Sequence, residues 1–158
     1  MADIAFAVGR ETDFQDFSGR IVLTRYPKMK VHLPSDHPLC KRSSLRFQDL
    51  QNETFILYPS MKETFTRELQ LSMLKQSGIS FRIYEESCSP FFFDLLVPIG
   101  KGIRLWNWTD RTAPNSVLMT LEDDGYETFL YMLYDEKTEN PTTLSFIEGF
   151  LRFRKERR

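Results

Sequence analysis

Apolar runs and alternating stretches divide the chain into strand-like segments. Asp3–Val8 and Thr54–Pro59 are short apolar runs, which predict strands that are buried on both faces. Lys28–Leu33 alternates between polar and apolar residues, which predicts a half-buried strand with His32 on its solvated face. Further strands are expected at Ile21–Tyr26 (an edge strand, or one bulged at Pro27, because that proline interrupts it), Phe81–Ser87, Ile103–Trp108, Val117–Leu121 and Thr128–Tyr134.

Helices are predicted where apolar residues recur every three or four positions behind a capping residue. The first starts at a capping box of Ser60 and Glu63 and ends at Gly78. The second has Ser89 as its N-cap, and the third starts at Asn140. The side chains expected to face inward are Phe65, Leu69 and Met73 in the first helix, Phe92, Leu95, Leu96 and Ile99 in the second, and Leu144, Ile147, Phe150 and Leu151 in the third.

The alternation of strands and helices predicts an α/β fold. We expect right-handed crossovers and a Rossmann-like, mixed or largely parallel sheet with helices on both faces. The 158 residues fit one domain, or one domain plus part of another, and 41% hydrophobic residues suffice for a sizeable core. Ligands of such sheets bind beyond the carboxyl ends of the strands.

Composition argues against several classes of function. The formal net charge is -1, so the chain is not built to neutralise many phosphates, and the basic tail Arg152–Arg158 reads as a solvated helix end. Cys40 and Cys88 lack zinc-type spacing, which favours two reduced thiols in a cytoplasmic protein. No apolar run reaches the length of about 20 residues that spans a bilayer, and no signal peptide is visible. We expect no metal, cofactor or membrane partner.

The stretch Asp36–Arg42 raises the question of a reactive centre, because it brings His37 and Cys40 close together in sequence. A catalytic Cys-His pair also needs an orienting group and an oxyanion hole, and nothing nearby supplies them. The prolines on either side of Asp36 favour a connecting turn instead. Metal binding by Asp36 and the two histidines is disfavoured, because His32 is expected to face away from the turn.

A ligand site is predicted where two strands lead into capped helix starts, at Tyr58–Ser60 and at Ser89. Free backbone amides and the helix dipole at such a position favour a carboxylate or another anion. The alternative is that these two serines only cap their helices, and that Arg25 is an ordinary surface arginine. The residues predicted to bind the ligand are Gly9, Arg10, Arg25, Tyr58, Pro59, Ser60, Ser89 and Phe91.

Three stretches resemble LysR-type transcriptional regulators. Asp36–Ser60 resembles the part of that family in which a His-Pro-Leu turn leads through a short Asp-Leu helix into a buried strand. Phe91–Trp108 is similar to the helix that ends Val-x-x-Gly-x-Gly before a strand, and Thr128–Phe153 to the closing strand, turn and C-terminal helix. The three matches follow the order of the family and cover nearly the whole chain.

The resemblance implies an effector-binding region with two α/β subdomains joined by two hinge strands, like a type 2 periplasmic binding protein. Residues 3–134 would form the second regulatory subdomain with hinge strands 3–8 and 128–134, and residues 135–158 the C-terminal helix of the first. The rest of the first subdomain and the DNA-binding winged helix-turn-helix would be absent. The chain starts abruptly, directly before a strand-like run, which suggests that the natural gene product is longer. A small effector would bind in the cleft between the subdomains.

The function implied is ligand sensing without catalysis, with DNA bound only through the absent helix-turn-helix. We also expect self-association into a homodimer or a larger oligomer, because the helix Met61–Ser77 carries a second apolar stripe, Leu71 and Leu74, that would be left for an interface. Two alternatives use the same sheet edge. One is a small α/β enzyme with Asp94 or Glu86 as acid or base, and the other is a solute-binding protein.

Overall fold

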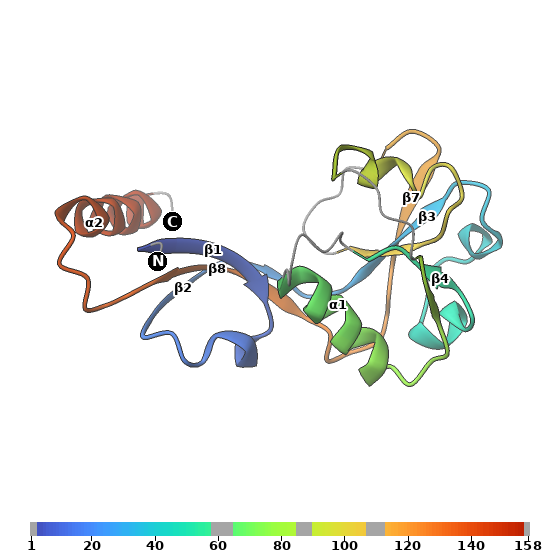
Figure 1. Ribbon diagram of the computed structural model, residues 1–158, viewed down its shortest axis with the longest axis horizontal. Coiled ribbons are helices and arrows are strands. Elements are labelled where there is room, and N and C mark those ends of the chain that lie inside the picture. The colour runs from blue at the N-terminus through green and yellow to red at the C-terminus, as the bar shows by residue number, and fades with distance from the viewer. Residues whose placement is uncertain (1–2, 58–64, 85–89, 107–112, 157–158) are drawn as a thin grey trace. The chain divides into compact units, whose positions relative to one another are not determined.

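The computed structural model describes residues 3–57, 65–84, 90–106 and 113–156 (Figure 1). The chain forms two compact units, one made of Met1–Arg25 with Phe129–Arg158 and the other of Tyr26–Thr128. The strands expected at 3–8 and 128–134 are present as β1 (Ile4–Gly9) and β8 (Thr128–Tyr134). The assignment of these ranges to regulatory subdomains and hinges stays a prediction.

The first unit contains a three-stranded sheet in the order β1-β8-β2, with β2 spanning Gly19–Tyr26 (Figure 1). β1 and β8 pair antiparallel, and the short 3-10 helix η1 (Glu11–Phe14) follows β1. Phe14 packs edge-on against Tyr131, with ring centroids 5.2 Å apart, in a small core. Gly19 permits close packing, because a side chain there would lie 2.5 Å from the Tyr134 ring.

The edge position of β2 confirms the prediction for Ile21–Tyr26. The expectation that Asp3–Val8 is buried on both faces is wrong, since Phe6 is 57% exposed. β1 is itself the other edge of the small sheet, so its apolar run is covered only in part. Here a continuous apolar run did not distinguish a central strand from an edge strand.

The helix α2 (Pro141–Glu156) completes the first unit. Its start is as predicted, because the Asn140 Oδ1 accepts a hydrogen bond of 3.0 Å from the Thr142 amide. Ile147 is buried, whereas Leu144 and Leu151 of the predicted inward face are exposed. The helix therefore buries a narrower stripe than its sequence pattern indicated.

The second unit combines antiparallel and parallel strands. β3 (Lys30–Pro34) lies between β6 (Arg104–Trp106) and β7 (Ser116–Thr120) and pairs antiparallel with both. β4 (Thr54–Phe55) pairs parallel with β5 (Arg82–Ile83). The predicted α/β class with a mixed sheet is confirmed, although its longer pairings are antiparallel.

The helix α1 (Phe65–Gln76) buries Leu69 and Met73 as predicted, and Gly78, with a φ of 70°, follows its last turn. Leu74 is also fully buried, and Leu71 packs against the same core. The expectation that these two leucines form a leftover stripe is therefore wrong, because the core of this unit surrounds more of the helix than one stripe.

The helix expected after Ser89 is η4 (Pro90–Leu95), a 3-10 helix and not an α-helix. A 3-10 helix has three residues per turn, so Phe93 and Leu96 share one face, and both are buried. Three residues of the predicted inner face, Phe92, Leu95 and Ile99, are exposed. That part of the prediction is wrong because it assumed the α-helical period.

Two further 3-10 helices, η2 (Pro38–Lys41) and η3 (Phe47–Leu50), connect β3 to β4. The His37 Nδ1 accepts a hydrogen bond of 3.3 Å from the Leu39 amide, and His37 caps η2. The Cys40 thiol donates to the Pro34 carbonyl oxygen at 3.3 Å. Both side chains thus stabilise the turn, as expected of a connector between strands.

Candidate functional site

Four of the eight residues predicted to bind the ligand lie outside the described residues. This applies to Tyr58, Pro59, Ser60 and Ser89, and also to Glu86, the alternative catalytic acid. Phe91 belongs to η4, and its side chain is not described. The strands that lead into these residues are described, and they define the edge where the site was predicted.

Two parallel strands, β4 and β5, end at this edge, and a third parallel segment runs beside β4 at Ile103 and continues into β6. The Tyr84 amide donates to the Phe55 carbonyl oxygen at 2.9 Å, which continues the pairing of β4 with β5. On the other side of β4, the Ile56 amide donates to the Ile103 carbonyl oxygen at 2.8 Å, in a parallel bridge. The carboxyl ends of parallel strands point to one edge of a sheet, so residues 58–64 and 85–89 both follow strands that end there.

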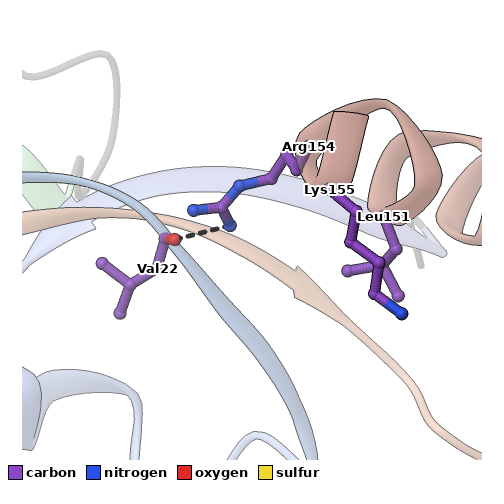
Figure 2. Close-up of a pocket in the computed structure, with 4 residues that line it drawn as sticks. All are labelled: Val22, Leu151, Arg154 and Lys155. Carbon is purple, nitrogen blue, oxygen red and sulfur yellow. Dashed lines mark hydrogen bonds between the residues drawn. The ribbon is translucent and has the colours of Figure 1, made fainter. Parts of the chain in front are cut away.

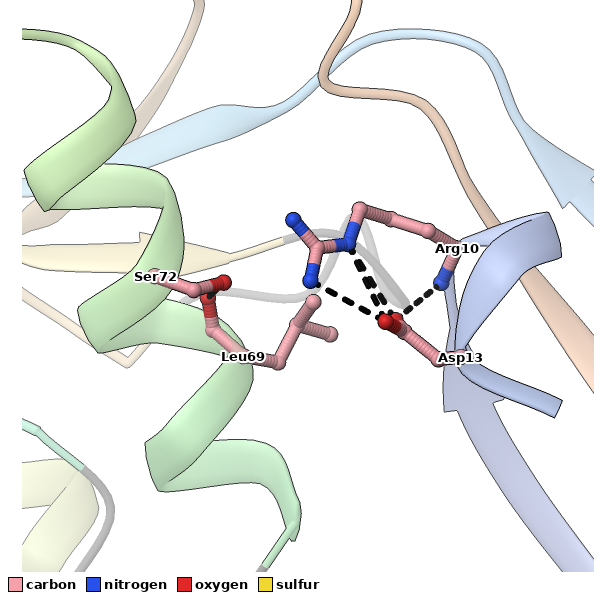
Figure 3. Close-up of polar contacts among 4 residues, drawn as sticks. All are labelled: Arg10, Asp13, Leu69 and Ser72. Carbon is pink, nitrogen blue, oxygen red and sulfur yellow. Dashed lines mark hydrogen bonds and ion pairs between the residues drawn. The ribbon is translucent and has the colours of Figure 1, made fainter.

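Gly9 is the last residue of β1, and Arg10 follows it as the N-cap of η1. The Arg10 side chain forms an ion pair of 3.0 Å with Asp13, and its backbone amide donates to the Asp13 Oδ2 at 2.8 Å (Figure 3). Gly9 is buried opposite Phe129 in the β1–β8 pair. Arg10 is therefore paired with a neighbouring carboxylate, and an anionic ligand would have to share its guanidinium with Asp13.

The remaining candidate, Arg25, lies exposed near the end of β2, in the same compact unit as Gly9 and Arg10. The predicted residues from Tyr58 to Phe91 belong to the other unit. Figure 3 also shows a bond of that second unit, in which the Ser72 Oγ donates to the Leu69 carbonyl oxygen of α1 at 2.9 Å. This bond satisfies the hydroxyl within its own helix.

A charged cluster that the sequence reasoning missed lies beside the predicted edge. Arg104 on β6 has a side chain that is only 3% exposed, and its Nη1 donates to the Asp94 Oδ1 at 2.8 Å. The guanidinium lies over the Trp106 ring, 4.0 Å from its centroid, and 4.8 Å from that of Phe93. Its Nη2 contacts the His32 Nδ1 at 3.3 Å.

His32 is buried at 3% exposure, so its expected place on a solvated strand face is wrong. The alternation in Lys28–Leu33 predicted the direction of the side chain but not what covers it. β3 is a central strand, and the facing residue on β6 is Arg104. The polar face of β3 therefore lies against a buried guanidinium instead of water.

The hydrogen bonds of His32 define one neutral tautomer. A guanidinium can only donate, so the Nδ1 facing Arg104 must be the acceptor and the Nε2 carries the proton. The Nε2 then donates to the Ser116 Oγ at 2.7 Å, and that hydroxyl donates to the Ala113 carbonyl oxygen at 2.7 Å. The donor-to-acceptor direction of these hydrogen bonds is thus the same throughout, from Arg104 on β6 through His32 on β3 to Ser116 on β7.

Burial and, after it, the charge of Arg104 together lower the pKa of His32 from 6.5 to about 4, against a weaker opposing effect of Asp94. His32 is therefore neutral at pH 7. Both of its ring nitrogens are engaged, and Asp94, the acid or base of the enzyme alternative, is bound to Arg104. The cluster is built to hold elements together and offers no poised base.

A signal for this cluster exists in the sequence. Arg104 stands inside the apolar run Ile103–Trp106, where a charged residue on a strand is costly unless it is paired. Alternation along the strand places Arg104 and Trp106 on one face. What the sequence alone does not give is the partner strand that brings His32 opposite.

The first unit has a pocket of about 260 Å³ between β2 and α2, lined by Val22, Leu151, Arg154 and Lys155 (Figure 2). The Arg154 Nη1 donates to the Val22 carbonyl oxygen at 2.8 Å, so α2 is attached to the exposed edge of β2. No helix within the described ranges has the length and apolar character needed to cross a membrane.

Comparison with known proteins identifies the fold. No family model matches the chain. The C-terminal domain of a probable LysR family transcriptional regulator from Rhodococcus sp. RHA1 matches with a TM-score of 0.73 and 16% identity, over 93% of this chain and 73% of that one. The CcmR regulatory domain of Synechocystis PCC6803 in complex with 2-PG matches with a TM-score of 0.74 and 15% identity, over 96% and 73%. The effector binding domain of QuiR in complex with shikimate matches with a TM-score of 0.71 and 19% identity, over 98% and 72%.

The chain thus has the fold of the effector-binding domains of LysR-type transcriptional regulators, and the resemblance seen in the sequence is confirmed. In sequence it is similar to the transcriptional dual regulator GltC of Bacillus subtilis (strain 168), with 32% identity over 104 residues, which are 65% of this chain and 33% of GltC. The chain covers about a third of the length of this relative.

Proposed function

We propose that this chain is the ligand-sensing part of a LysR-type transcriptional regulator and is not an enzyme. Its effector is a small carboxylate, bound at the edge where the parallel strands β4 and β5 end. One observation carries the proposal: the parallel strands β4 and β5 end side by side, and both lead into the residues that the sequence predicts to be anion-binding helix starts. The position of the effector in a cleft between two subdomains stays a prediction.

The choice of a carboxylate rests on the chemistry of helix starts. Backbone amides at the first turn have no partner within the helix, and the dipole there favours negative charge. Ser60 and Ser89 would add hydroxyl donors. Shikimate, which is bound in the QuiR structure, is itself a carboxylate.

The regulator as a whole is a further proposal, because the chain covers only 33% of GltC. We expect this chain alone not to bind operator DNA specifically, since its net charge is -1 and DNA affinity depends on neutralising phosphates. A cytoplasmic location, with DNA contacted through a separate helix-turn-helix, completes this proposal. A sequence-specific band shift by this chain at physiological salt would contradict it.

Self-association is proposed on the surface of α2. Its exposed apolar residues are Leu144, Phe146, Leu151 and Phe153. Apolar residues that gather on one helix favour an interface. Sedimentation velocity should show a concentration-dependent dimer or larger species, which Phe146→Lys shifts toward the monomer. A monomer at every concentration would contradict this part of the proposal.

A thermal-shift series tests the ligand class. Shikimate, benzoate and 2-PG are titrated against the chain, because a ligand at a hundred times its Kd adds about 2.7 kcal/mol to the free energy of unfolding. At least one carboxylate should raise the Tm. Ser60→Ala and Ser89→Ala should reduce that rise, whereas Ser72→Ala, which removes a hydroxyl bonded within α1, should preserve it. An unchanged rise in both test variants would refute the placement. Conversion of a bound probe to product would support the enzyme alternative.

A further inference from the structure

We infer that Arg104 is a positioning residue that fixes η4 to the β6-β3-β7 sheet through Asp94 and thereby sets the affinity of the effector site without contacting the effector. This inference rests on the proposed function, because η4 starts directly after Ser89. Arg104 itself lies outside the helix starts at Ser60 and Ser89 where the effector is proposed to bind. All of the contacts involved lie within the second unit.

The η4 helix depends on contacts outside itself. It has six residues, and short 3-10 helices form few and poorly directed internal bonds. Its next turn is closed by a bond of 3.3 Å from the Leu96 amide to the Phe93 carbonyl oxygen. Phe93, Leu96 and Val97 pack with Ile56 in a small apolar cluster. Hydrophobic contacts of this kind are largely non-directional, so they do not fix the orientation of η4 by themselves.

Arg104 supplies the directional contact. It holds η4 by two side chains at once, since it donates to the Asp94 carboxylate and lies against the Phe93 ring. Asp94 is 71% exposed, yet its carboxylate is bound to a guanidinium that is almost completely buried. A buried cation that loses a carboxylate partner is strongly penalised, so the position of Asp94, and with it η4, is coupled to Arg104.

The other side of the guanidinium is fixed by the strands. His32, in its neutral tautomer, accepts a hydrogen bond from Arg104 and donates one to the Ser116 hydroxyl, which in turn donates to the Ala113 carbonyl oxygen. Arg104 is thus oriented by β3 and β7 and by the ring of Trp106 before it reaches Asp94. Lysine would keep the charge, but it has no planar fork to bond Asp94 and His32 together.

The test uses four variants of the chain. Asp94→Asn removes the carboxylate charge with little change in shape, Asp94→Glu keeps it, and Arg104→Lys removes the fork. Asp124→Asn is the matched control, because Asp124 is another exposed carboxylate, paired with Lys28 at 2.9 Å. Hydrogen exchange of a peptide covering 90–99 reports the order of η4, and a peptide covering 65–76 reports α1. Calorimetry with shikimate, benzoate and 2-PG reports affinity.

Asp94→Asn should raise exchange in the 90–99 peptide about tenfold and leave the 65–76 peptide unchanged, because the bond lost is charge-assisted. Whichever probe binds the parent should bind this variant several-fold more weakly. Asp94→Glu should recover most of both effects, Arg104→Lys should resemble Asp94→Asn, and Asp124→Asn should resemble the parent.

The inference is overturned if Asp94→Asn exchanges like the parent, or if Asp94→Glu is no better than Asp94→Asn. Faster exchange with unchanged probe affinity overturns the link to the effector site. If the parent binds none of the probes, the proposed ligand class fails, and the link to affinity fails with it. The exchange data then decide by themselves whether Arg104 positions η4, so the two failures are distinguishable.

Discussion

The buried histidine gives a pH dependence that can be worked out from the structure. The pKa of His32 is lowered from 6.5 to about 4 in the folded chain, mainly by burial and then by Arg104. Between these two values the unfolded chain binds a proton that the folded chain does not. The free energy of unfolding therefore falls as the pH falls from 6.5 toward 4, by up to about 3 kcal/mol from this residue.

Denaturant unfolding at several pH values between 7 and 4 measures this contribution. Carboxylates also titrate near pH 4, so the comparison is with His32→Gln, whose amide keeps an acceptor for Arg104 and a donor for Ser116 but does not titrate. The loss of stability on acidification should be smaller in this variant by most of that amount. His37→Gln, which removes the other histidine, should keep the contribution of His32. Parallel curves of unfolding free energy against pH for the wild type and His32→Gln would show that His32 does not titrate in this way.

The remaining predictions concern packing, turns and caps, all read from the free energy of unfolding. Gly102→Ala should cost more than about 1 kcal/mol, because φ is 157° and a side chain would collide with a carbonyl oxygen of β4. Gly149→Ala, in open space on α2, should instead stabilise by about 0.5–1 kcal/mol, and equal effects would contradict the geometry. Leu74→Ala should cost about 2–5 kcal/mol and Leu71→Ala less, since of these two leucines only Leu74 is fully buried. A larger cost for Leu71→Ala would indicate that Leu71 is covered by an interface after all. Asn140→Ala should cost about 1 kcal/mol, and no loss would show that its cap bond to α2 is absent in solution.

Local signals in the sequence predicted local structure well. Pro27 indicated the edge strand β2, Asn140 the start of α2, and Gly78 the end of α1. Each of these residues acts through its own backbone restrictions or a bond to a near neighbour, so little depends on the rest of the fold. The order of strands and helices likewise sufficed for the α/β class.

Burial was harder to predict, because it depends on segments far away in sequence. His32 looked solvated from its alternation with Lys30, but β6 brings Arg104 beside it from 72 positions later. In η4 almost every residue is apolar, so the sequence did not distinguish a 3-10 period from an α-helical one. The sequence predicted the two strands, β4 and β5, that lead into the candidate site, and the binding of a ligand there stays a prediction. The serines it named, Ser60 and Ser89, lie outside the described residues.

Amide NMR spectra of the isotope-labelled chain, titrated with shikimate and the other carboxylates, show directly whether a carboxylate binds at this sheet edge. A carboxylate that binds should perturb the amides at the ends of β4 and β5, starting with those of Ile56 and Tyr84, and the amides of η4, more strongly than the amides of α2. Perturbation confined to α2, or no perturbation by any carboxylate at millimolar concentration, would contradict the proposal that this sheet edge senses an anionic effector.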